Sequence, residues 1–410
     1  MSISIQLNLC HKQVLIVGGG NVALRKCQQY VNEGAQVTVV AKTLHKEFAN
    51  KPIHIIQGEF EISYLQHKFL VYAATDDLVL NEYITKLCDQ YGILCGSATR
   101  SKYRSFSSMQ QYHNAYVHLA LSTNEVAVKL SKKMVEKGME HIMAVYGKKL
   151  ALLQQIKNMI ATQTYAQIRG IISLFTEDKL ETLLQMLKKK RVYVLVYHGV
   201  ADENITVHDT NRFIKQIEYE QSVCISCVAS KNVSVYCKEY LPNVFLFDEV
   251  LKLASYCKDI AFYFDIVLIR EGRYFHKLAK QCKSVGQLIP FWFQKEVKKE
   301  YIRKICTQND DTCCIFVLHD FDEEFHIIAQ QYQGLCMGLK DEIPEVTNKN
   351  IHLVPVFMSK GSHFIDDVLH KDIGIYARLA NQNYHITTDK IPIMEQAWFI
   401  DLYKTRLHNI

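Results

Sequence analysis

The sequence predicts an α/β protein in which a helical segment joins two α/β regions. From residue 5 to about 120, short apolar runs alternate with helical patterns, which is typical of a mostly parallel sheet. Residues 124–190 place apolar side chains at helical spacing without a strand pattern, and the alternation resumes near residue 191. A chain of 410 residues also exceeds the usual size of one core. We therefore expect three parts: residues 1–122, 123–190 and 191–410.

Composition excludes several classes of protein. The chain is 49% hydrophobic and 22% charged, as expected for packed globular domains. No apolar run reaches membrane-spanning length and the first residues lack the basic region of a signal peptide, so we expect a cytoplasmic protein without a membrane partner. The 13 cysteines are then expected to be reduced thiols. A net charge of +6 is too small to indicate nucleic-acid binding, although it suits an anionic small substrate.

A glycine turn between a strand and a helix predicts a dinucleotide site. Gly18 permits the tight turn, Gly20 allows backbone N–H groups to approach a pyrophosphate, and Ala23 fills the third small position. An ordinary strand-to-helix turn is the alternative, but a second strand at residues 36–40 has the spacing of a βαβ unit. The predicted cofactor-binding residues here are Gly18, Gly19, Gly20, Asn21 and Val22. The candidate strands of this region are Val14–Val17, Val37–Val40, Ile53–Gln57, Phe69–Ala73, Ile93–Cys95 and Tyr116–Leu121.

One element of the dinucleotide pattern is missing. The second strand ends in Ala41 and Lys42, with no Asp or Glu to bind a ribose 2′-OH. The choice between NAD and NADP is therefore open at this point, and Lys42 would favour a 2′-phosphate.

The middle segment has two interpretations. Its helical pattern indicates either a dimerisation arm or a helical cap on its own domain, and the basic cluster Lys188–Arg191 reads as a solvated helix end. The apolar positions are Val126, Leu130, Met134, Met143, Leu150, Leu153, Ile156, Met159, Ile168 and Leu174.

The C-terminal region contains a faint internal repeat. Ile266–Phe275 parallels Leu353–Phe364, with glycine and phenylalanine as the firmest matches, so we expect two related α/β halves. Cys224 and Cys227 have metal-like spacing but lie in an apolar strand, and we interpret them as core side chains. The candidate strands are 192–197, 223–228, 265–269, 314–318 and 351–357.

The first region resembles the N-terminal module of siroheme synthase, the precorrin-2 dehydrogenase family. The matching residues are Gly18–Lys26, Tyr72–Asp77 with Asn81, and Ser105–Phe106. The resemblance implies NAD-dependent oxidation of precorrin-2 to sirohydrochlorin. It also implies that Ala74, Thr75 and Asp76 border the nicotinamide side of the cofactor, with a helix N-cap as the alternative role of Asp76 and Asp77.

Two departures from this family concern the chemistry. Thr99 stands where the family carries its proposed acid/base aspartate, and a hydroxyl cannot accept a proton near neutral pH. Another group then takes the proton, or it leaves to solvent. The substrate loop is also shortened, to Ser122–Asn124. Hydride transfer needs only aligned carbons and a bound cofactor, so we expect dehydrogenation to survive both changes.

The C-terminal region resembles the cobaltochelatase and sirohydrochlorin ferrochelatase family. The matching patches are Tyr197–Gly199 and Pro355–Asp367. The resemblance implies that His198 and His363 are the catalytic and metal-binding residues, since imidazole can hold Fe²⁺, Co²⁺ or Ni²⁺ and accept a pyrrole proton.

The partner of His198 has two candidates. In the family the pair belongs to one half, whereas the first half here has Tyr274 at the expected position. His276 is one substitute, and His363 is the one we favour. His319 also ends a strand, but no glycine follows it.

These resemblances imply a fused enzyme of siroheme biosynthesis. We expect a dehydrogenase with NAD, a homodimer, tetrapyrrole substrates, and Fe²⁺ as the inserted metal. Arg100, Lys102 and Arg104 are candidates for binding substrate carboxylates. The alternatives are a chelatase with a degenerate nucleotide-binding domain, or a non-catalytic tetrapyrrole sensor.

Overall fold

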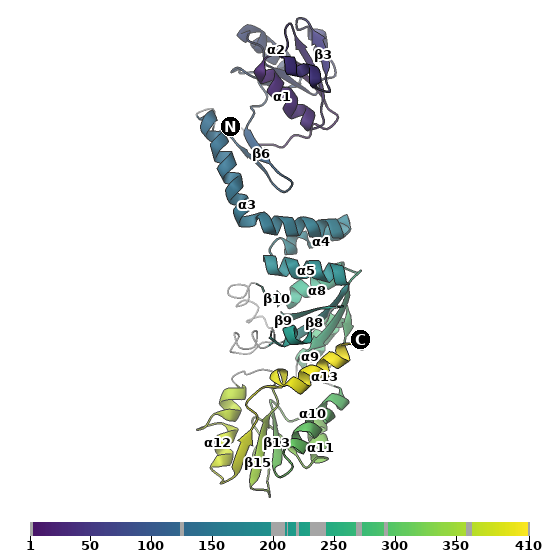
Figure 1. Ribbon diagram of the computed structural model, residues 1–410, viewed down its shortest axis with the longest axis vertical. Helices are drawn as coiled ribbons and strands as arrows, with labels where there is room; N and C mark the ends of the chain where they lie inside the picture. The colour runs from purple at the N-terminus through teal and green to yellow at the C-terminus, as the bar shows by residue number, and fades with distance from the viewer. Residues whose placement is uncertain are drawn as a thin grey trace. The chain divides into compact units, whose positions relative to one another are not determined.

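The computed structural model describes residues 3–123, 127–197, 210, 212–218, 221–229, 243–267, 273–290, 294–357 and 363–408. The chain divides into two compact units, Met1–His141 and Ile142–Ile410, and each is described by itself (Figure 1). Within the described residues, no helix combines the length and apolarity needed to cross a membrane.

The first unit is built on a five-stranded parallel sheet. Its order is β3-β2-β1-β4-β5, so the strand order reverses between β1 and β4. This topology confirms the predicted parallel α/β region. The strands are β1 (Gln13–Val17), β2 (Gln36–Ala41), β3 (His54–Gln57), β4 (Leu70–Ala73) and β5 (Leu94–Ser97). The helices and 3-10 turns between them are α1 (Asn21–Asn32), η1 (Lys46–Asn50), η2 (Ile62–Leu65) and α2 (Leu78–Gln90).

Strand β1 is buried on both faces. Val14 and Ile16 pack with Ala23 of α1, whereas Leu15 and Val17 pack with Ile84 of α2. Successive side chains of a strand point to opposite faces, so a continuous apolar run is what a sheet covered by helices on both sides requires. The same property made this strand readable from the sequence.

The last strand predicted for this region is not part of the parallel sheet. β7 (His118–Leu121) pairs antiparallel with β6 (Gln110–His113) in a separate two-stranded sheet. The Asn114 side chain accepts hydrogen bonds from the N–H groups of Tyr116 and Val117, at 2.8 and 2.9 Å. This local turn reverses the chain into a hairpin, so the assignment of Tyr116–Leu121 to the parallel sheet was wrong.

The middle helices contribute to the second unit's core. They are α3 (Val128–Met159), α4 (Thr162–Ile172) and α5 (Glu177–Lys189). Ile156, Ile168 and Leu183 are fully buried in one cluster with Val192 and Val194 of the adjoining sheet. Other apolar positions of the segment remain exposed: Leu130, Met134, Met159 and Leu174.

The second unit contains two parallel sheets. The first has the order β10-β9-β8-β11-β12 and the second has β14-β13-β15-β16. The strands of the first are β8 (Arg191–Tyr197), β9 (Val223–Val228), β10 (Phe245–Leu246), β11 (Ala261–Ile266) and β12 (Gln287–Leu288). Those of the second are β13 (Cys313–Leu318), β14 (Leu335–Gly338), β15 (Asn350–Pro355) and β16 (His385–Thr388). Helical elements are α8 (Phe247–Tyr256), α9 (Arg273–Lys283), α10 (Lys295–Gln308), α11 (Glu323–Gln330), η3 (His363–Leu369), α12 (Ile375–Ala380), η4 (Ile393–Glu395) and α13 (Ala397–His408).

The two sheets confirm the prediction of two related halves. In the first half, β8 lies between β9 and β11. In the second half, β13 lies between β14 and β15 in the same way. The repeated segments Ile266–Phe275 and Leu353–Phe364 begin within or at the end of these equivalent strands β11 and β15. The faint sequence repeat therefore marks the same connection, strand to helix, in both halves.

Helix α13 connects the halves through a buried polar contact. The Tyr403 hydroxyl donates a hydrogen bond to the carboxylate of Asp265 on β11, and both residues are buried. The Tyr403 ring packs against Tyr193 of β8 and against Phe213. The same core cluster includes Phe316 of β13, so residues of both sheets meet around this helix (Figure 1).

Replacing Tyr403 with phenylalanine should destabilise the second unit by about 1–3 kcal/mol, because the buried Asp265 carboxylate loses a donor. Urea unfolding followed by tryptophan fluorescence measures this, since Trp398 lies on the same helix and stacks on Tyr301. Tyr256→Phe, at a tyrosine that is 39% exposed, is the matched control. Equal unfolding free energies for the two variants would contradict the role given to this contact.

Candidate functional site

The glycine turn directly follows β1 and lies next to the carboxyl ends of the two neighbouring strands, β2 and β4. Gly18 has a φ of +128°, and a Cβ there would lie 2.2 Å from the carbonyl oxygen of Ala74. A Cβ on Gly19 would lie 1.9 Å from the carbonyl oxygen of Thr43. Glycine is therefore required at both positions, by backbone conformation and close contact at Gly18 and by close contact at Gly19. The fold brings Gly18 and Gly19 together with Ala74, as a site built from these predicted residues needs.

The start of helix α1 is open in a way that fits a pyrophosphate. Gly20 is the N-cap residue, no side chain caps the helix, and its first turn contains no acidic residue. A Cβ on Gly20 would have no atom within 4 Å. The backbone N–H groups around Asn21 and Val22 therefore retain donors for an anion, which the helix dipole also favours. Ala23 is fully buried, as close packing of helix and strand requires.

The segment after β4 is held by a buried asparagine. Asn81 is fully buried, accepts from the N–H and hydroxyl of Thr75 at 3.1 and 2.8 Å, and donates to the Thr75 carbonyl at 2.9 Å. Asp77 caps α2, since its carboxylate accepts from the N–H groups of Val79 and Leu80. Asp76 is exposed beside it. The N-cap interpretation therefore applies to Asp77 and not to Asp76, although both residues are exposed.

Two exposed apolar side chains at the start of α2 escaped the sequence analysis. Leu78 is 66% exposed and Val79 is 79% exposed. They follow the end of β4, at the same edge as the glycine turn. A run of apolar residues directly after a helix cap cannot all face the core, and this was the signal available in the sequence. Such side chains suit a flat, partly apolar ligand.

Thr99, just after β5, contacts another hydroxyl, and a buried lysine lies near the same strand end. The Thr99 N–H donates to the Ser97 hydroxyl at 3.2 Å, and the two hydroxyls lie 3.1 Å apart. Lys26 is 6% exposed, and its ammonium contacts Ser108 at 2.7 Å and lies 5.4 Å from the centre of the Tyr72 ring. Burial, and then the charge of Arg25, lower the pKa of Lys26 to about 8. The Tyr72 hydroxyl donates to the Ser97 carbonyl at 3.4 Å, so the lysine adjoins this strand end.

The histidines predicted for metal insertion are only partly described. His198 follows β8 directly and lies outside the described residues, while His363 is the first residue of the π-helical segment η3 and its side chain is likewise outside them. His276 is exposed on α9 and stacks edge-on against Phe275 at 5.7 Å. The pairing of His198 with His363 therefore falls outside the part of the chain that the structure describes.

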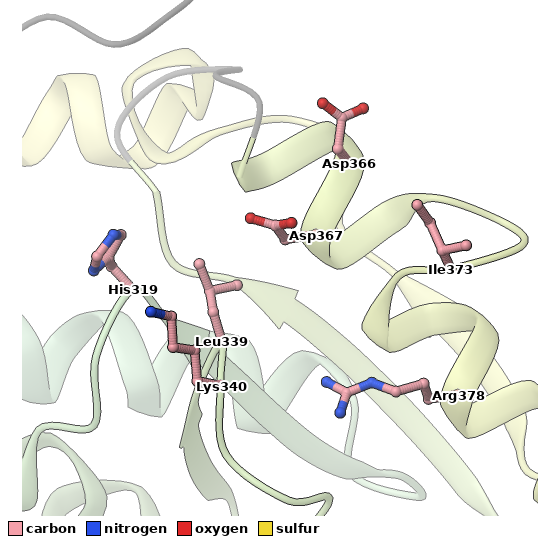
Figure 2. Close-up of a pocket in the computed structure, with 7 residues that line it drawn as sticks. All are labelled: His319, Leu339, Lys340, Asp366, Asp367, Ile373 and Arg378. Carbon is pink, nitrogen blue, oxygen red and sulfur yellow. The ribbon is translucent and has the colours of Figure 1, made fainter.

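A cavity of about 410 Å³ lies at the carboxyl edge of the second half. Its walls come from the residues that follow β14 and β13, from η3 and α12, and from the segment between these two helices: His319, Leu339, Lys340, Asp366, Asp367, Ile373 and Arg378. Figure 2 shows the Asp367 carboxylate directed toward the side where His319 and Lys340 lie, whereas Asp366 points away. The His319 ring also contacts Asp320, at 3.1 Å. This is the edge where open parallel sheets bind ligands.

His319 has more structural support than its sequence pattern suggested. In the sequence it directly follows β13 as His198 directly follows β8, and these are the first strands of the two halves. β13 pairs directly with β15, whose connection leads to His363. The second half therefore carries a histidine at both equivalent positions. Among the described residues, no group of three His, Cys, Asp or Glu side chains could hold a metal ion.

Cys224 and Cys227 are confirmed as core side chains. They pack in different core clusters on opposite faces of the sheet, so they cannot share a metal. Burial raises the pKa of Cys227 well above its usual value, which keeps the thiol protonated.

Comparison with known families defines the class of the first unit. Residues 5–108 match a family model described as "Putative NAD(P)-binding". Together with the sheet order and the open glycine turn, this match identifies an NAD(P)-binding α/β domain of the Rossmann type.

The particular relatives are siroheme synthases. The chain is 35% identical over 134 residues to the siroheme synthase of Baumannia cicadellinicola subsp. Homalodisca coagulata, which covers 32% of this chain and 29% of the relative. It is 32% identical over 181 residues to siroheme synthase 2 of Yersinia pseudotuberculosis serotype O:1b (strain IP 31758), covering 42% and 38%. The chain thus spans between 29% and 38% of the length of these curated relatives. A solved structure named "SirC, precorrin-2 dehydrogenase" aligns with 46% of this chain and 100% of its own, with 21% identity and a TM-score of 0.38.

Replacing Gly20 with alanine should weaken NADH binding at least about tenfold while leaving the fold intact, because the new methyl group meets no protein atom but separates the phosphate from the backbone N–H groups. Fluorescence titration with NADH measures the dissociation constant. Gly170→Ala is the matched control, since a Cβ there is equally free of contacts. If both variants bind NADH like the parent, the pyrophosphate does not lie at this turn.

Proposed function

We propose that this chain catalyses two consecutive steps of siroheme biosynthesis. The first unit oxidises precorrin-2 to sirohydrochlorin with NAD⁺, and the C-terminal region then inserts Fe²⁺. The open glycine turn at the reversal of strand order is the observation that carries the proposal. The similarity to siroheme synthases supports this choice of substrates. We further propose that the enzyme acts as a cytoplasmic homodimer.

In the oxidation, the protein's task is to hold two flat molecules in contact and to dispose of a proton. The residues Gly18–Val22 would bind the pyrophosphate, and the backbone of Ala74 and Thr75, fixed by Asn81, would border the nicotinamide. A bound NAD⁺ would accept a hydride from a carbon of the substrate. Leu78 and Val79 would exclude water from one side of the tetrapyrrole, and Arg100, Lys102 and Arg104 remain candidates for its carboxylates.

The accompanying proton needs an acceptor other than Thr99. A hydroxyl is not basic enough, so the proton leaves to solvent or to the Lys26 amine. Burial lowers the pKa of Lys26 to about 8, so this amine loses its proton more readily than an ordinary lysine. Loss of the family aspartate is also what favours the second candidate function, a chelatase whose first unit only binds nucleotide or tetrapyrrole.

For metal insertion we propose His198 and His363 as the residues that hold the incoming metal and accept the pyrrole protons. His319 is the second candidate for the role of His198, because it lines the cavity of the second half. Iron follows from the coupling to precorrin-2 oxidation, and Co²⁺ or Ni²⁺ would be held by the same imidazole chemistry.

Anaerobic incubation with precorrin-2 and NAD⁺, without metal, should produce NADH at a rate proportional to enzyme. Thr99→Val should change this rate by no more than about twofold, because its hydroxyl is not the proton acceptor. Gly20→Ala should lower the rate strongly at low NAD⁺. Absence of both NADH from NAD⁺ and NADPH from NADP⁺ would reject the dehydrogenase and favour the chelatase alone.

Metal insertion should fall by at least about a hundredfold in His363→Ala when sirohydrochlorin and Fe²⁺ are supplied, because a base for the pyrrole proton is lost. In a separate assay with precorrin-2 and NAD⁺, the same variant should form NADH at the parent's rate. The partner is identified by comparing His198→Ala, His276→Ala and His319→Ala, and His385→Ala, at an exposed residue of β16, is the control. Unchanged insertion in all four of the other variants would remove the chelatase assignment.

A further inference from the structure

The end of β2 has no Asp or Glu of its own, but the structure brings an acidic residue to it from another strand. In dinucleotide-binding α/β domains, a carboxylate about 20 residues after the glycine turn binds the ribose 2′-OH, whereas a cation nearby accommodates a 2′-phosphate. In this chain Lys42 follows β2 directly. A lysine alone would indicate NADP.

Glu59 reaches this place from the neighbouring strand. β3 pairs in parallel with β2, and Ala41 lies opposite Gln57. The next residue, Gly58, donates its N–H to the Ala41 carbonyl at 3.1 Å, which continues the pairing beyond both strands. The Glu59 carboxylate then lies 2.8 Å from the Lys42 ammonium. Strand pairing therefore brings together two charges that are 17 positions apart in the sequence.

The pair lies beside the turn that would hold the pyrophosphate. The residue after Lys42 is Thr43, whose carbonyl oxygen packs directly against Gly19. His45 donates its N–H to the Gly19 carbonyl at 2.9 Å. The loop that starts with Lys42 is thus attached to the glycine turn, and the ribose next to a bound pyrophosphate falls within its reach.

We propose that Glu59 is the carboxylate that binds the adenosine ribose hydroxyls, and that Lys42 positions it, so that the site selects NAD over NADP. This inference rests on the proposed nucleotide site of the first unit. Lys42 occupies one carboxylate oxygen, and the carboxylate retains acceptor capacity for a ribose hydroxyl. A 2′-phosphate would meet the same negative charge and be repelled.

Stability does not explain this ion pair. The side chains of Lys42 and Glu59 are 71% and 77% exposed, and exposed pairs contribute little to folding. Their hydrogen bond raises the pKa of Lys42 and lowers that of Glu59, so both are charged at neutral pH. A nucleotide that covers the pair would remove water from it and strengthen its interactions. Substitutions here should therefore alter binding without unfolding the unit.

The test is the ratio of dissociation constants for NADH and NADPH, measured by fluorescence titration of the full chain at one fixed ionic strength. The parent chain should prefer NADH. Glu59→Gln should weaken NADH binding about tenfold and strengthen NADPH binding, because the ribose loses a charged acceptor and Lys42 becomes free. Lys42→Gln should keep the preference for NADH, since the carboxylate remains. Glu61→Gln, an exposed carboxylate two residues further on, is the matched control and should leave the ratio unchanged.

Three results would overturn the proposal. One is a parent chain that prefers NADPH, and another is an unchanged ratio in Glu59→Gln. In both cases a nucleotide still binds, so the proposed oxidation of precorrin-2 by a nicotinamide nucleotide stands, and only the choice of nucleotide or of its ribose ligand fails. If neither nucleotide binds to the parent chain or to Glu61→Gln, the selectivity and the proposed oxidation fail together. No tetrapyrrole is used, so the substrate assignment does not influence the outcome.

Discussion

Parallel strand pairing is the constraint on which the rest of this structure depends. All three of the larger sheets are parallel, so every strand of a sheet ends at the same edge. Each connection must cross back over a face, which covers both faces with helices and leaves the carboxyl edge to loops. The glycine turn, the Thr75 segment and the Lys42–Glu59 pair all lie at one such edge. The cavity beside His319 lies at another.

The two halves of the second unit share a topology but carry different residues after their equivalent strands. β8 and β13 are each followed by a histidine, but the later connection leads to Tyr274 in the first half and His363 in the second. A shared strand order keeps both places at the sheet edge whatever residues occupy them. A half can therefore lose one member of a pair without any change in fold. The cavity with charged walls lies in the half that has both histidines.

Much of this arrangement could be predicted from the sequence, because it follows from local patterns of apolar residues. Features that arise from pairing between distant segments could not be predicted in this way. Strands buried on both faces, such as β1 and β13, are continuous apolar runs, so they were found almost to the residue. β7 has similar local composition, and only the Asn114 turn reveals that it forms a hairpin. Glu59 was missed because its approach to Lys42 arises from the pairing of β2 with β3, and no sequence spacing encodes that pairing. Lys26 was assigned to a motif, since burial of a lysine cannot be seen from its neighbours in the chain.

The contact between Tyr403 and Asp265 has a consequence for synthesis of the protein. These residues are separated by 138 positions, and the tyrosine completes a core that also contains β8. At translation rates of about 5–20 residues per second, β11 waits roughly 7–28 seconds for this partner to emerge. During that interval the first half exposes an aromatic surface and a carboxylate that the finished fold buries. During this period a chaperone that binds the exposed surface of the first half would protect it from pairing with the wrong segment.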